Sequence, residues 1–121
     1  MQRVLKLLMS TFLASTLVAT AAFAHAFLDH AIPSVGGTVH GPVSELRMWY
    51  TQGVVVAFSA FTVSGPGGAV PASKPVNNPS NQQEVIVHLG RPLGPGTYTV
   101  NWRALSVDTH TTTGTFRFTV S

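Results

Sequence analysis

A carboxylate and an imidazole lie two residues apart near the C-terminus and could bind a metal ion together. They belong to Asp108-Thr109-His110, in a polar stretch before the last alternating segment. Residues i and i+2 of an extended segment lie on the same side, so the spacing predicts that Asp108 and His110 present their donors to one point. By itself such a triplet is common, and Asp108 could instead cap a turn by bonding its own backbone.

A second imidazole, that of His25, follows a segment with the three-part layout of a secretory signal peptide. The layout consists of a basic start at Arg3 and Lys6, an apolar run over 7–23, and small residues at Ala22 and Ala24. We predict that residues 1–24 are a cleaved signal peptide and that residues 25–121 form one exported domain. The alternative is a retained membrane anchor, since the apolar run is nearly long enough to span a bilayer.

Cleavage before His25 would create a ligand pair that an internal residue lacks. A free N-terminal histidine offers its α-amine and its ring Nδ1, which close a chelate ring on a metal, whereas an internal backbone nitrogen must first lose its amide proton. The chain has no cysteine, and Met48 is the only methionine beyond residue 24. Two imidazoles, an amine and a carboxylate suit tetragonal Cu(II), which also leads the divalent affinity order. We therefore predict one Cu(II) per mature chain, held by His25, Asp108 and His110.

The elements that must position these groups follow the strand period. Apolar residues alternate with polar ones over 46–51, 84–89, 98–103 and 116–120, and a first strand is expected near 27–32. The nearly continuous β-branched and aromatic run over 54–63 predicts a strand that is buried on both sides or lies at the centre of a sheet. The proline- and asparagine-rich residues 71–82 predict a surface loop. About seven short strands at this spacing predict an all-β, Greek-key β-sandwich, barrel-like or immunoglobulin-like.

Charge and motifs exclude several functions. The chain carries a formal charge of +3, but Arg3 and Lys6 belong to the predicted signal, which leaves five Lys and Arg against four Asp and Glu. Without a basic cluster we expect no nucleic-acid partner. No G-x-S-x-G elbow of a serine hydrolase and no glycine-rich phosphate loop occurs.

Two segments carry a resemblance to a known family. Residues 98–110 read YTVNWRALSVDTH and residues 114–120 read GTFRFTV. Together they resemble the C-terminal signature of the CopC family of periplasmic copper-resistance proteins, and the start at His25-Ala26-Phe27-Leu28 resembles the family's mature N-terminus. The resemblance implies a periplasmic copper-binding β-sandwich or barrel whose Cu(II) ligands match His25, Asp108 and His110.

The chain departs from the family pattern at three places. Thr109 stands where members commonly have glycine, and Gln52 stands where many have a glutamate, a better metal ligand. With Met48 alone, we do not expect the methionine-rich Cu(I) site of some members. His30, His40 and His88 match no family ligand, although His30 is close enough in sequence to His25 to serve as a spare one.

These observations favour a binding module over an enzyme. The expected role is copper sequestration, homeostasis or delivery by a monomer, with an inner-membrane copper importer as a candidate partner. One alternative is a copper monooxygenase, because polysaccharide oxygenases use the same N-terminal histidine brace. The other is an exported sandwich with a purely structural or adhesive role.

Overall fold

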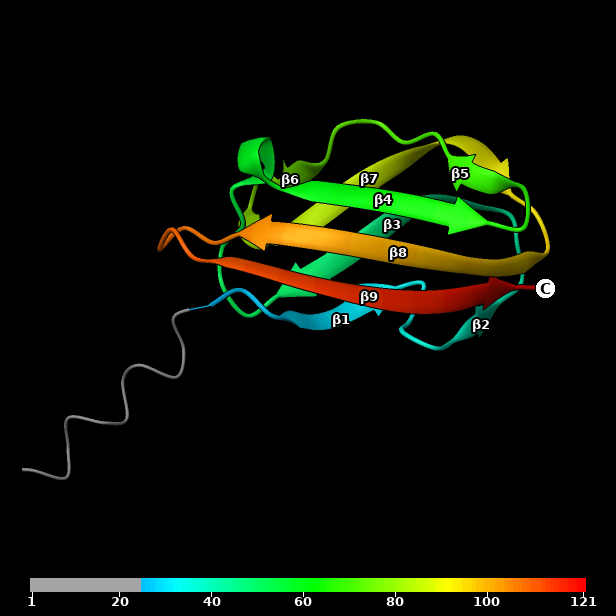
Figure 1. Cartoon of the computed structure of the whole chain (residues 1–121), viewed down its shortest axis with the longest axis horizontal. Coiled ribbons are helices and arrows are strands. Elements are labelled where there is room, and N and C mark those ends of the chain that lie inside the picture. The colour runs from blue at the N-terminus through cyan, green and yellow to red at the C-terminus, as the bar shows by residue number, and fades with distance from the viewer. Residues whose placement is uncertain (1–24) are drawn as a thin grey trace, which may run out of the picture.

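The computed structural model describes residues 25–121, which fold into two packed β-sheets (Figure 1). The predicted signal peptide lies outside the described residues. The strands are β1 (Leu28–Ile32), β2 (Thr38–Val39), β3 (Val43–Tyr50), β4 (Ala60–Gly65), β5 (Gly68–Val70), β6 (Val76–Asn78), β7 (Asn81–Leu93), β8 (Gly96–Leu105) and β9 (Thr111–Val120). One sheet has the order β1-β3-β7-β6 and the other β2-β9-β8-β4-β5. The all-β sandwich prediction is confirmed.

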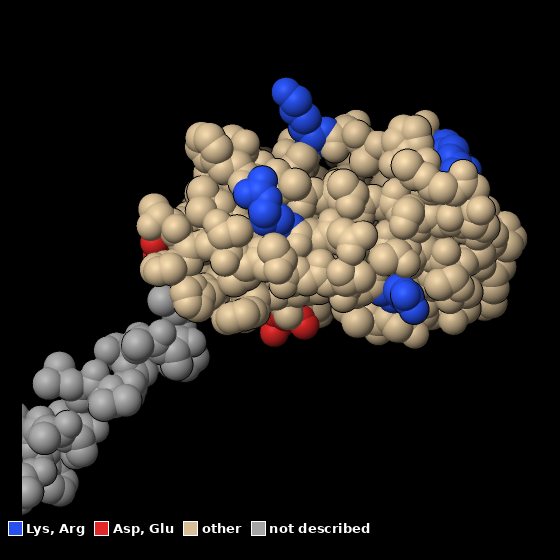
Figure 2. Space-filling view, viewed as in Figure 1, with Lys and Arg blue, Asp and Glu red and all other residues tan. Residues whose placement is uncertain are grey.

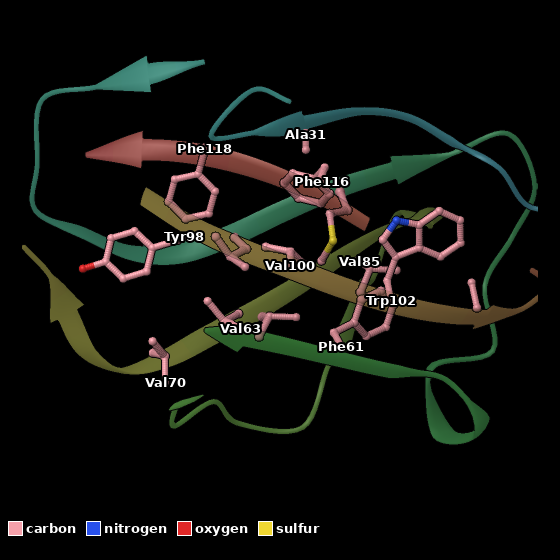
Figure 3. Close-up of a cluster of buried hydrophobic side chains, with 14 of the residues drawn as sticks. Ala31, Phe61, Val63, Val70, Val85, Tyr98, Val100, Trp102, Phe116 and Phe118 are labelled. Carbon is pink, nitrogen blue, oxygen red and sulfur yellow. The ribbon is translucent and has the colours of Figure 1, made fainter. Parts of the chain in front are cut away.

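The core lies between the sheets and is built from the residues that alternation assigned to one face. Val100 of β8 pairs with Phe116 of β9, and Tyr98 pairs with Phe118. All four side chains are buried, and Figure 3 shows them projecting into the space between the two sheets. Burying such side chains contributes about 1.5–3 kcal/mol each. A chain without cysteine is therefore held together by this packing.

The prediction of a strand over 54–63 is wrong for its first half only, since residues 60–63 do lie in β4, inside the five-stranded sheet. The chain instead forms a short 3-10 turn, η2 (Val56–Phe58), and β4 begins only at Ala60. Ser59 explains the break, because its hydroxyl donates to the Val55 carbonyl (2.8 Å) and accepts the Leu105 amide (2.9 Å). A serine side chain that bonds nearby backbone competes in this way with a strand ladder.

The prediction of a loop over 71–82 is also wrong in part. Residues Val76–Asn78 form β6 at the edge of a sheet, and β7 begins at Asn81. The side-chain amide of Asn77 donates to the carbonyls of Val54 (3.3 Å), Gln82 (3.0 Å) and Glu84 (3.3 Å). Asparagine is common in turns, but here the side-chain amide of Asn77 holds an edge strand in place.

One end of the sandwich brings together the two segments that carry the predicted ligands. The turn between β8 and β9 and the start of the described chain both lie at the left end of Figure 1. The face shown in Figure 2 carries a few well-separated Lys and Arg side chains and no basic cluster. Within residues 25–121, no helix is long and apolar enough to cross a membrane.

Candidate metal centre

Residues 25–27 are held against the end of β3 by Thr51. The Thr51 amide donates to the Phe27 carbonyl (2.8 Å), and the Phe27 amide donates to Thr51 Oγ1 (3.0 Å). The same hydroxyl donates to the His25 carbonyl (3.0 Å). Ala26, between these residues, is fully buried. The backbone that carries the His25 ring is therefore anchored to the fold.

The predicted ligand pair Asp108 and His110 sits on a tight turn and not on an extended segment, so that part of the prediction is wrong. Thr109 has a φ of 72°, in the left-handed region, and its amide donates to the Ser106 carbonyl (2.9 Å). The Ser106 amide in turn donates to the His110 carbonyl (2.9 Å). The turn nevertheless brings Asp108 Oδ2 within 3.4 Å of His110 Nδ1.

Buried Ser106 orients the Asp108 carboxylate. Its hydroxyl donates to Asp108 Oδ1 and also lies 3.1 Å from the His110 carbonyl. The His110 amide approaches the same Oδ1 at 3.4 Å. The hydrogen bond from Ser106, followed by the amide and ring of His110, lowers the pKa of Asp108 below its ordinary value. The carboxylate is thus held in its ionised form, which is the form that can bind a metal ion.

The His25 ring meets the His110 ring across the end of the sandwich. Their centroids are 4.6 Å apart and their planes cross at 75°. Among residues 25–121, Nδ1 of His25 is buried and has no hydrogen-bond partner. An unsatisfied buried polar atom costs about 1–3 kcal/mol and is uncommon in native proteins. The orphaned atom is the ring nitrogen that an N-terminal chelate would use.

The structure brings the predicted ligands together in pairs. His25 contacts His110, and His110 contacts Asp108. Within the described residues, no three His, Asp or Glu side chains already form a group that could hold a metal ion. The joint use of His25, Asp108 and His110 by one ion therefore stays a prediction.

The other histidines have partners of their own. His30 stacks on Trp49, with centroids 4.4 Å apart, and its Nδ1 lies 2.6 Å from Asp29 Oδ2. His88 Nδ1 lies 3.4 Å from Glu45 Oε2, and His40 Nδ1 lies 2.7 Å from Ser121 Oγ. The contacts of each of the three are to groups outside the candidate centre.

The sequence pattern did not reveal Thr51 or Ser106, which hold the candidate ligands in place. Ser106 lies two residues before Asp108, and a serine at that spacing can bond a turn carboxylate. No comparable signal marked Thr51, because its partners, His25 and Phe27, lie far from it in the chain.

Several proteins of known sequence match most of the chain, among them two from Escherichia coli. Protein YobA of Escherichia coli K12 is 35% identical over 112 residues, which cover 89% of this chain and 88% of that protein. Copper resistance protein C of Escherichia coli is 32% identical over 110 residues, which cover 85% of this chain and 86% of that protein.

Solved structures share the fold. The methionine-rich copper resistance protein PcoC of Escherichia coli superposes with a TM-score of 0.72 at 27% identity, covering 80% of this chain and 99% of that one. CopC of Methylosinus trichosporium OB3b gives a TM-score of 0.73 at 27% identity, covering 80% of this chain and 94% of that one.

The family model for the CopC domain matches residues 28–121, which span all nine strands of the two sheets. This match agrees with the relatives and with the solved structures. The chain is a member of the CopC family.

Proposed function

We propose that the mature protein binds one Cu(II) ion in the periplasm and serves copper sequestration, homeostasis or delivery. The ligands are the α-amine and Nδ1 of His25, the His110 imidazole and the Asp108 carboxylate. A candidate recipient or donor is an inner-membrane copper importer. Three relatives are named copper resistance protein C, which supports copper as the cargo.

One observation carries the proposal: Nδ1 of His25, which is buried and has no hydrogen-bond partner among residues 25–121, belongs to a ring 4.6 Å from that of His110. Nδ1 is the ring nitrogen that closes a chelate with an N-terminal amine. A metal ion would satisfy this atom, and cleavage before His25 would supply the amine beside it.

The donor set favours Cu(II) over Cu(I). Imidazole, amine and carboxylate suit Cu(II), whereas soft thioether and thiolate donors select Cu(I). Met48, the only thioether in 25–121, is fully buried in the core, and Tyr50 donates a hydrogen bond to its sulfur at 3.9 Å. The Met48 sulfur is therefore not accessible to a metal ion at the surface.

Binding is supported better than oxygenase chemistry at the same site. A monooxygenase needs open positions on its copper for oxygen. The Asp108 carboxylate, at 3.4 Å from His110 Nδ1, would occupy or crowd one of them. We therefore propose a binding protein and not an enzyme.

The test is mass spectrometry of the exported protein, combined with a competitive Cu(II) titration. A first residue of His25 and one bound Cu(II) per chain are the expected results. A mature chain that begins elsewhere, or that takes up no Cu(II) against a weak chelator, would refute the proposal.

A further inference from the structure

We propose that Thr112 is a positioning residue for the metal centre, through a hydroxyl that ties the strand carrying His110 to the segment carrying His25. This inference rests on the proposed function, because it specifies what holds the two imidazoles of that same site at their spacing.

The two ligand-bearing segments belong to different sheets. His25 leads into β1, an edge strand of the four-stranded sheet, whereas His110 leads into β9 of the five-stranded sheet. Thr51, directly after β3, anchors residues 25 and 27 to the sheet of β1. A separate link is therefore needed to set the distance between the His25 segment and β9.

Thr112 provides that link. Its Oγ1 donates to the Ala26 carbonyl at 2.5 Å. Ala26 follows His25 directly and is fully buried, and Thr112 lies two residues after His110. The bond therefore joins the two sheets within one residue of the first ligand and two residues of the second.

The position of Thr112 on β9 indicates that its hydroxyl serves to make this hydrogen bond and not to pack in the core. Thr112 pairs with buried Ala104 of β8 and is half-buried, while its neighbours Thr111 and Thr113 are exposed. It thus shares the inward face of β9 with the core residues Phe116 and Phe118. A hydroxyl on an inward face costs stability unless it is hydrogen-bonded, so a valine would pack there as well if packing alone mattered.

A preset spacing between ligands should raise the affinity for the metal. Groups outside the ligand set that orient metal ligands typically change metal affinity by about 10–100-fold when removed. Without the Thr112 bond, the His25 segment keeps its anchor to Thr51 but loses its tie to β9. We therefore expect weaker Cu(II) binding and a less uniform copper geometry from an intact fold.

The test compares Thr112→Val, which keeps the branched shape and removes the hydroxyl, with Thr112→Ser, which keeps the hydroxyl. Thr113→Val, on the exposed face of the same strand, is the matched control. Thr112→Val should weaken Cu(II) about tenfold in a competitive titration and broaden the Cu(II) electron paramagnetic resonance spectrum. Thr112→Ser and Thr113→Val should match the wild-type protein in both measurements.

A purely structural role for Thr112 would lower the melting temperature of Thr112→Val and leave the affinity and the resonance spectrum of the folded protein unchanged. That result would overturn the inference. If Thr112→Val does not fold, Thr112→Ala removes the same hydroxyl with a smaller side chain and must show the same loss.

The two proposals fail in different ways. Wild-type affinity in the Thr112 variants, together with loss of binding in His110→Ala, would refute the positioning role and leave the proposed function standing. Absence of Cu(II) binding by the wild-type protein would refute the proposed function, and the positioning role with it.

Discussion

The imidazole of His25 meets that of His110 edge-on, with ring centroids 4.6 Å apart and planes crossing at 75°. The two residues are far apart in the sequence and belong to segments that lead into different sheets. Beside this pair, Asp108 lies 3.4 Å from His110 Nδ1. Each of these three residues can be tested by a single substitution.

Removal of the His110 ring should abolish most Cu(II) affinity. We expect His110→Ala to lose more than about a hundredfold and Asp108→Asn about tenfold, because the carboxylate is either one oxygen ligand or a support for the histidine. His88→Ala, a histidine paired with Glu45 elsewhere on the fold, is the control and should bind as the wild type does. A competitive titration checks all three, and normal binding by His110→Ala would contradict the assignment.

The N-terminal amine should matter as much as the ring. A protein with one alanine added before His25 keeps every side chain but converts the amine into an amide, which must lose a proton before it can bind a metal. We expect this extended form to bind Cu(II) far more weakly than protein that begins at His25. Equal affinities of the two forms in a chelator competition would show that the amine is not a ligand.

Cu(I) should bind poorly, and Met48 should not be involved. The Met48 side chain is fully buried, whereas the structural relative PcoC is described as methionine-rich. Met48→Leu should leave Cu(II) affinity unchanged and cost less than about 1.5 kcal/mol of stability, as volume-conserving core replacements usually do. Tight Cu(I) binding that disappears in Met48→Leu would contradict this expectation.

Tyr50 should make the metal-free protein less stable in alkali. Burial raises the pKa of Tyr50 well above its ordinary value of about 10. The stabilisation is fully present below pH 10 and is lost as pH rises toward the folded-state pKa, because only the unfolded chain then releases the proton. The free energy of unfolding should therefore fall above pH 10, by up to about 1.4 kcal/mol per pH unit more than in Tyr50→Phe. Denaturant titrations of both proteins at several pH values measure this difference, and parallel curves would rule out the effect.

Thr109→Gly should stabilise the fold. Thr109 is a β-branched residue with a φ of 72°, a conformation that costs roughly 1–2 kcal/mol for side chains with a Cβ. Glycine removes that cost but adds about 0.4–1 kcal/mol of unfolded-chain entropy, so the net gain should lie between about 0 and 1.6 kcal/mol. Thr111→Gly, in regular strand two residues later, should instead destabilise the protein. Thermal unfolding checks both variants, and a lower melting temperature for Thr109→Gly would contradict the strain argument.

Local patterns in the sequence were sufficient to predict much of the fold. Alternation over 98–103 and 116–120 identified the inward faces of β8 and β9, because a strand buried on one side repeats every two residues. Alternation failed where a side chain bonded to the backbone. Ser59 bonds to the Val55 carbonyl, and a 3-10 turn interrupts the run over 54–63. Asn77 holds β6 in place within residues that were expected to form a loop.

For the candidate centre, the sequence alone singled out His25, Asp108 and His110 by residue type and by their positions relative to the predicted cleavage site and to each other. It could not show that the His25 ring reaches His110, that Ser106 holds the carboxylate, or that Thr112 joins the two sheets beside the candidate ligands. These contacts depend on the packing of two sheets. Periodicity reports which side of one segment is apolar, whereas the partner of a polar group on another segment is decided only when the tertiary structure brings the two together.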